Sequence, residues 1–80
     1  MEHSPRKLPF RRAQDARRTL ERKELMDNLS ATRVLIQQAY TGFNHASDRD
    51  LIDSYVFEIT ALQSRYAYLL RRVKELEGSA

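Results

Sequence analysis

The sequence predicts an all-α fold, an antiparallel two-helix hairpin of the coiled-coil kind. Two observations support this prediction. Both prolines, Pro5 and Pro9, lie in the first ten residues, so the chain from about residue 13 onward is free to be helical. Apolar side chains then recur at alternating spacings of three and four residues in two long stretches. This periodicity is typical of helices that each bury one apolar stripe.

The first helix is expected over about residues 13–43, after a flexible basic N-terminal arm of residues 1–12. Its apolar stripe begins at Leu25 and ends at Phe43. Upstream of Leu25 the same face carries charged side chains, although the segment is rich in good helix formers. We therefore expect that part of the helix to lack a buried face and to be frayed or to await a partner.

The second helix is expected over about residues 48–77. A connection of residues 44–47 is so short that the two helices must run antiparallel. Ser47 or Asp48 suits the N-cap, where a short polar side chain accepts a backbone hydrogen bond. The apolar stripe of this helix, which we predict to be an interaction face, comprises Ile52, Tyr55, Ile59, Leu62, Tyr66, Leu69, Val73 and Leu76.

Other large apolar residues lie outside the two stripes. They are Leu35, Tyr40, Leu51, Val56, Phe57, Tyr68 and Leu70. Two helices cover only one side of each other, so these residues predict a further surface that needs covering. A homodimeric four-helix bundle would cover it most simply, and docking on another protein is the alternative.

One histidine and three aspartates, His45, Asp48, Asp50 and Asp53, lie close together near the middle of the chain. They suggest a metal or acid–base site, but the central glycine and terminal glutamate of a calcium loop are missing. Helix capping explains them better, because Ser47 with Asp50 resembles a capping box and acidic groups suit the positive end of a helix dipole. We expect no metal site and a solvated turn histidine.

The sequence also argues against an enzyme. It has no cysteine, no glycine-rich phosphate loop and no serine–histidine–aspartate arrangement. We expect no cofactor. No apolar run approaches the roughly 18 residues that a membrane span needs, and the N-terminus lacks the apolar core of a signal peptide. We therefore expect a soluble, cytoplasmic protein.

Positive charge is concentrated at the N-terminus. Residues 1–23 hold eight Lys/Arg and three Asp/Glu, a net charge of +5, whereas residues 24–80 hold six and eight, a net charge of −2. The segment could bind phosphates of a nucleic acid, an acidic protein surface or, as the least favoured partner, anionic lipid. A solvated tail is the other interpretation. The predicted phosphate contacts are Arg11, Arg12, Arg17, Arg18 and Arg22.

A second basic stretch, RYAYLLRR at residues 65–72, interleaves aromatic and basic side chains. Such interleaving is found where proteins stack bases and bind phosphates. Tyr66 and Leu69 fall on the apolar stripe, however, and Arg71 and Arg72 lie near the helix C-terminus, where cations are favoured. We therefore interpret this stretch as core and helix end.

Two blocks of the sequence form a recognisable pair: FNHASDRDLID at residues 43–53 and RYAYLLR at residues 65–71. Together they resemble the YaaL-like family of small Firmicutes proteins of unknown function. Arg49 departs from the family pattern, which usually has proline at this first helical position. The resemblance covers about residues 25–76 and implies a short helical bacterial protein with no established activity.

Overall fold

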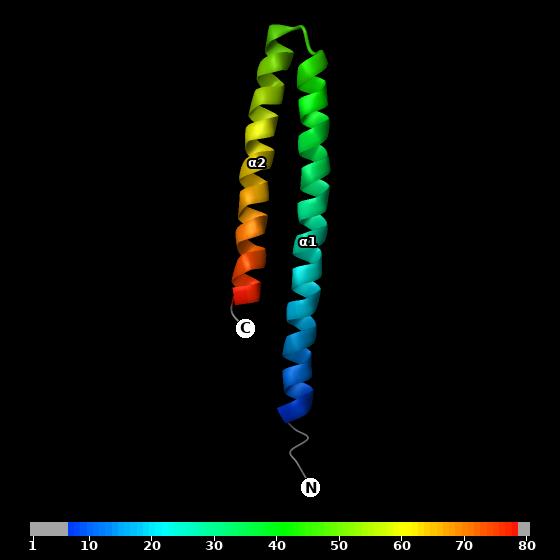
Figure 1. The fold of residues 1–80 in the computed structure, drawn as a ribbon, viewed down its shortest axis with the longest axis vertical. Coiled ribbons are helices and arrows are strands. Elements are labelled where there is room, and N and C mark those ends of the chain that lie inside the picture. The colour runs from blue at the N-terminus through cyan, green and yellow to red at the C-terminus, as the bar shows by residue number, and fades with distance from the viewer. Residues whose placement is uncertain (1–6, 79–80) are drawn as a thin grey trace.

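A computed structural model describes residues 7–78, which form two long antiparallel helices side by side (Figure 1). Helix α1 runs from Lys7 to His45 and helix α2 from Arg49 to Gly78. Their lengths of 39 and 30 residues correspond to about 58 and 45 Å. The predicted all-α hairpin is confirmed for the described residues.

Helix α1 begins earlier than the sequence predicted, at Lys7 instead of about residue 13. Pro9 therefore lies within the first turn. A proline is tolerated there, because the first four N–H groups of a helix have no acceptor inside it and the missing donor costs nothing. Residues 7–12 of the predicted arm are thus part of α1, and the rest of that arm, residues 1–6, lies outside the described residues.

The connection between the helices spans residues 46–48, one or two positions later than predicted. Asp48 is the capping residue: the backbone N–H of Leu51 donates to its carboxylate Oδ1 at 3.0 Å. The structure thus decides between Ser47 and Asp48. His45 is the last residue of α1 and not a turn residue, and its ring Nδ1 donates to the carbonyl oxygen of Thr41 at 2.8 Å when the proton is placed on that nitrogen.

The core is a single seam along which the two apolar stripes meet. One cluster buries Leu29, Leu69 and Val73, with Leu25 and Tyr66 packed against it. The cluster nearer the turn consists of Ala39, Ile59 and Leu62 together with Ile36, Phe43 and Tyr55. Buried Thr32 lies between them along α1. Among the described residues no buried side-chain nitrogen or oxygen lacks a hydrogen-bond partner.

Gly42 leaves space near the turn for the ring of Tyr55 from α2 to pack against α1. A Cβ atom at this position would overlap the ring of Tyr55 from α2. No glycine of the described residues has a positive φ, so the glycine is required here for space and not for its backbone conformation. This space lets the Tyr55 ring lie across the α1 backbone.

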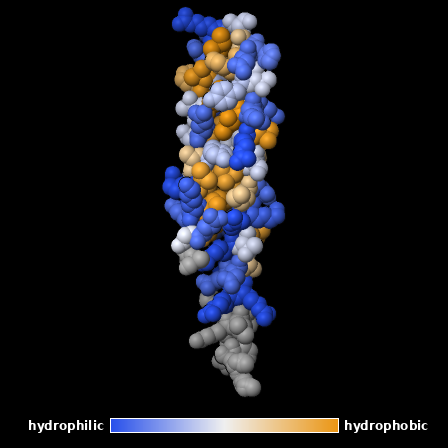
Figure 2. Space-filling view, viewed as in Figure 1, coloured by the Kyte–Doolittle hydropathy of each residue, from blue (hydrophilic) through white to orange (hydrophobic). Residues whose placement is uncertain are grey.

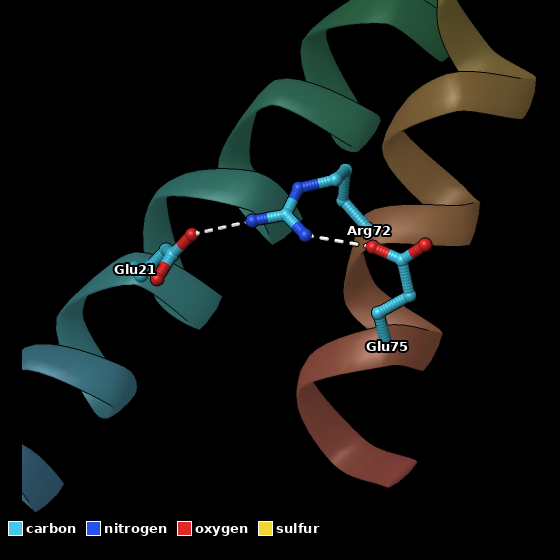
Figure 3. A network of polar contacts seen from close by, with 3 residues as sticks. All are labelled: Glu21, Arg72 and Glu75. Carbon is cyan, nitrogen blue, oxygen red and sulfur yellow. Dashed lines mark hydrogen bonds and ion pairs between the residues drawn. The ribbon is translucent and has the colours of Figure 1, made fainter. Parts of the chain in front are cut away.

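Ion pairs join the helices at the open end of the hairpin. Arg72 donates from Nη2 to Oε2 of Glu21 at 2.9 Å and from Nη1 to Oε1 of Glu75 at 2.7 Å (Figure 3). Arg22 donates from Nε and Nη2 to one oxygen of Glu77, at 3.0 and 2.7 Å. Beyond these contacts α1 continues alone, past the end of α2 (Figure 1).

Candidate protein interaction surface

The predicted interaction face of α2 forms the hairpin's own seam. Of its eight residues, four are buried and four are half-buried against α1. The reason is physical: when two antiparallel helices of one chain both carry the three-four spacing, their stripes pack against each other. A surface for a further partner must therefore be sought among the residues outside the stripes.

The large apolar residues outside the stripes are exposed in the structure. All seven of them are exposed, and Phe57 is the most exposed at 74%. Four of the seven belong to one stretch of α2 and lie outside its seam with α1. We call this stretch the outer face of α2 and define it by Val56, Phe57, Thr60, Ala61, Gln63, Ser64, Ala67, Tyr68 and Leu70.

The outer face of α2 carries no charged residue. Between residues 54 and 70 the only charged side chains are Glu58 and Arg65, and neither belongs to the face. Figure 2 shows apolar side chains gathered along the paired part of the hairpin and hydrophilic ones towards the end where α1 continues alone. Hydrophobic side chains are therefore concentrated in the paired part of the hairpin and are scarce where α1 continues alone.

Polar groups on the outer face have partners within the hairpin. Gln63 Nε2 donates to the hydroxyl of Tyr40 on α1 at 3.2 Å, which ties the middle of the face to the first helix. The Thr60 hydroxyl donates to the carbonyl oxygen of Val56 at 2.9 Å. A partner could cover these groups at a lower desolvation cost than if they depended on water alone.

A model of the family described as "Protein of unknown function (DUF2508)" matches residues 9–78. The chain belongs to this family. The DUF2508 match spans both helices and the turn, so the hairpin as a whole is the family's unit. No curated protein and no solved structure matches the chain. The DUF2508 description assigns no activity, so a function must be argued from the hairpin itself.

The predicted phosphate contacts of this DUF2508 protein do not all lie together. Arg11, Arg12, Arg17 and Arg18 are exposed on the part of α1 that continues past α2. Arg22 differs, because its guanidinium is bound by Glu77 at the open end of the hairpin. Four of the five arginines thus remain presented together on the extension.

The predicted absence of a metal site concerns His45 and the aspartates around the turn. These side chains are exposed, and Asp48 is engaged as the helix cap. Within residues 7–78 no group of three or more His, Cys, Asp or Glu side chains is placed to hold a metal ion. In the same part of the chain, neither helix is long and apolar enough to cross a membrane.

Three basic side chains have a raised pKa. A hydrogen bond to Asp27, reinforced by its charge, raises the pKa of Lys23. The hydrogen bond to Glu75 is the main cause that raises the pKa of Arg72. For Arg33 the pKa rises because Nη2 donates to the Tyr66 hydroxyl at 3.0 Å. These cations therefore keep their charge throughout the physiological pH range.

Two features of α1 are not predicted by the apolar stripes. Met26 and Leu20 of α1 are large, apolar and exposed, but they stand outside the three-four spacing that marks the seam. Gly42 is the other feature, because its role depends on the ring that packs against it. A glycine in an otherwise regular helical pattern often has a packing reason, so its position is the signal that indicates a close contact.

Proposed function

We propose that this DUF2508 protein is a non-enzymatic interaction protein that binds a protein, either a different chain or its own second copy, through the outer face of α2. The observation that carries the proposal is the exposure of Phe57, Tyr68, Val56 and Leu70 on one uncharged face. We place this role in the cytoplasm of a Gram-positive bacterium, the setting that the resemblance to YaaL-like Firmicutes proteins implies.

The composition of the face supports this proposal. Aromatic residues are enriched at protein interfaces, and charged residues are depleted at interface centres. Phe57 and Tyr68 supply two aromatic rings, while the charged Glu58 and Arg65 lie beside the face. An apolar face with a charged border is the usual arrangement of a docking surface.

Site-specific photo-crosslinking in the producing cell tests the proposal. A photoreactive amino acid replaces Phe57 in one variant and Val34 in the control. Val34 is a suitable control because it lies on α1 and is 51% exposed. We expect discrete protein adducts from position 57 and none from position 34. Equal labelling at both positions, or no adduct from position 57, would contradict the proposal.

A second candidate function is nucleic-acid binding by the extension of α1. The observation that favours it is the continuation of α1 past α2, which exposes Arg11, Arg12, Arg17 and Arg18 together. Exposed arginines on a helix neutralise phosphates and release counterions. Since no base-reading motif accompanies them, we expect such binding to be independent of sequence and sensitive to salt.

Gel-shift titrations with duplex DNA and with RNA test this second function. One variant replaces the four arginines of the extension by glutamine, which preserves helix propensity. A control replaces Arg49 and Arg65 of α2 in the same way. We expect the first variant alone to lose a salt-sensitive shift. If the shift persists in that variant, or if wild-type protein gives none, the extension is not a nucleic-acid site.

A further inference from the structure

The outer face of α2 has two strips. Val56, Gln63 and Leu70, seven residues apart, lie on the strip beside α1, where Gln63 bonds to Tyr40. The strip farther from α1 consists of Phe57, Ala61, Ser64 and Tyr68, at spacings of four, three and four. This second strip reads aromatic, small, small, aromatic in both directions, so it is matched by its own copy turned end to end, as a two-fold symmetric contact requires.

We propose that the occupant of this face is a second copy of the chain, with the two α2 helices antiparallel and the two-fold axis near Gln63. This inference rests on the proposed function and names its partner. In this arrangement Phe57 of one chain meets Tyr68 of the second copy, and Ala61 meets Ser64. Each of these contacts occurs twice.

Small side chains occupy the middle of the face. Thr60, Ala61, Ser64 and Ala67 lie around Gln63, between the two aromatic residues. Small residues at a helix crossing let the backbones approach, so that the larger side chains on either side can make contact. The rings of Phe57 and Tyr68 would then pack in two equivalent aromatic pairs, a favourable contact beyond the area it buries.

The charges of α2 favour the antiparallel orientation over the parallel one. Residues 49–62 hold one basic and three acidic side chains, a net charge of −2. Residues 64–78 hold four basic and two acidic side chains, a net charge of +2. An antiparallel pair places each acidic half against the basic half of the second copy, whereas a parallel pair would place like charges together.

One ion pair follows from this register. Asp53 lies one helical turn before Phe57, and Arg71 lies one turn after Tyr68. The guanidinium of Arg71 lies over the Tyr68 ring, with 5.7 Å between its Cζ atom and the ring centroid. Where Phe57 meets Tyr68 of the second copy, Asp53 therefore comes close to Arg71 of that copy.

The size of the face predicts a weak dimer. The outer face from Val56 to Leu70 is about 21 Å long, which is short for a standard protein interface. We therefore expect a reversible dimer with a dissociation constant of about micromolar order.

Sedimentation velocity of the full chain, from low micromolar to several hundred micromolar, tests the inference by charge reversal. We expect the wild type to dimerise with increasing concentration. Asp53→Arg and Arg71→Asp each place like charges together twice, so each should weaken the dimer about tenfold. The double variant restores both pairs and should dimerise nearly as well as the wild type.

Val34→Glu on α1 serves as the control and should dimerise like the wild type. Circular dichroism establishes that every variant keeps its helices. A wild type that stays monomeric, single reversals that dimerise normally, or a double variant that fails to recover would each overturn the inference. If the chain is monomeric but position 57 crosslinks to a different protein, the proposed function stands and the second copy is excluded.

Discussion

The ring of Tyr55 packs against Gly42 and leaves no room for a side chain there. Glycine inside a helix costs about 1 kcal/mol relative to alanine, so Gly42→Ala would be stabilising if space allowed it. The added Cβ would overlap the Tyr55 ring, which must then move. The effect of Gly42→Ala on stability therefore depends on whether the gain in helix propensity exceeds the cost of displacing the Tyr55 ring.

We predict that Gly42→Ala destabilises the wild-type hairpin and stabilises a Tyr55→Ala background by up to about 1 kcal/mol. Urea denaturation of the four proteins in this double-mutant cycle measures both effects. Gly42→Ala should therefore lower the free energy of unfolding in the wild type and raise it in the Tyr55→Ala background. The same effect of Gly42→Ala in both backgrounds would show that the ring does not limit the space.

Asp48 caps α2 through the hydrogen bond that it accepts from the N–H of Leu51. We predict that Asp48→Ala lowers the free energy of unfolding by about 1 kcal/mol, as is usual for loss of an N-cap. Asp48→Asn should retain most of the stability, and Ser47→Ala serves as the neighbouring control. If Ser47→Ala lowers the free energy of unfolding as much as Asp48→Ala or more, Asp48 is not the residue that caps α2.

Residues differ in how far their roles follow from the sequence. The cap is predictable to within one residue, since short polar side chains before an apolar periodicity mark a helix start. The contact of Gly42 with Tyr55 is not predictable in this way. Periodicity describes each helix alone and does not fix the register between α1 and α2. Arg22 does not lie with the other four arginines for the same reason: its ion pair with Glu77 depends on that register.

At the scale of the helices, adjacent Leu69 and Leu70 separate the seam from the outer face. Leu69 is 6% exposed and packs with Leu29 and Val73, whereas Leu70 is 37% exposed. We predict that Leu69→Ala costs about 2 to 5 kcal/mol of unfolding free energy. Leu70→Ala should cost much less when both are measured by denaturation at low protein concentration. Equal costs would contradict the assignment of the seam.

The helices themselves are largely predictable, and their exposed faces only in part. The three-four spacing alone identifies the seam residues, including Ile59 and Leu62. It shows that a stripe is buried but not what buries it, and the stripe predicted as an interaction face is covered by α1. The start of α1 differs from the prediction because a proline in the first turn ends no helix.

At the scale of the whole molecule, the hairpin has a basic end and a body in which charges of both signs surround an uncharged face. The basic end is the extension of α1 with the ion pairs around Arg72, and the body carries the outer face of α2. The uneven charge follows directly from the sequence. The partner does not follow from the sequence, because the residues of the outer face can be named only after the residues of the seam are known.

The central claim is that the outer face of α2 binds a second copy of the hairpin antiparallel, about an axis near Gln63. A distance between two turns tests it most directly. The chain has no cysteine, so Ser47→Cys accepts a single nitroxide label at the turn. We predict an intermolecular distance of about 45 to 50 Å in pulsed electron–electron resonance, because each turn lies some 24 Å along α2 from the axis.

Dilution with unlabelled protein should reduce the dipolar modulation and leave the distance unchanged, as expected for a signal between chains. A distance below about 20 Å would indicate parallel helices. Either that short distance or the absence of dipolar coupling at several hundred micromolar protein would contradict the account.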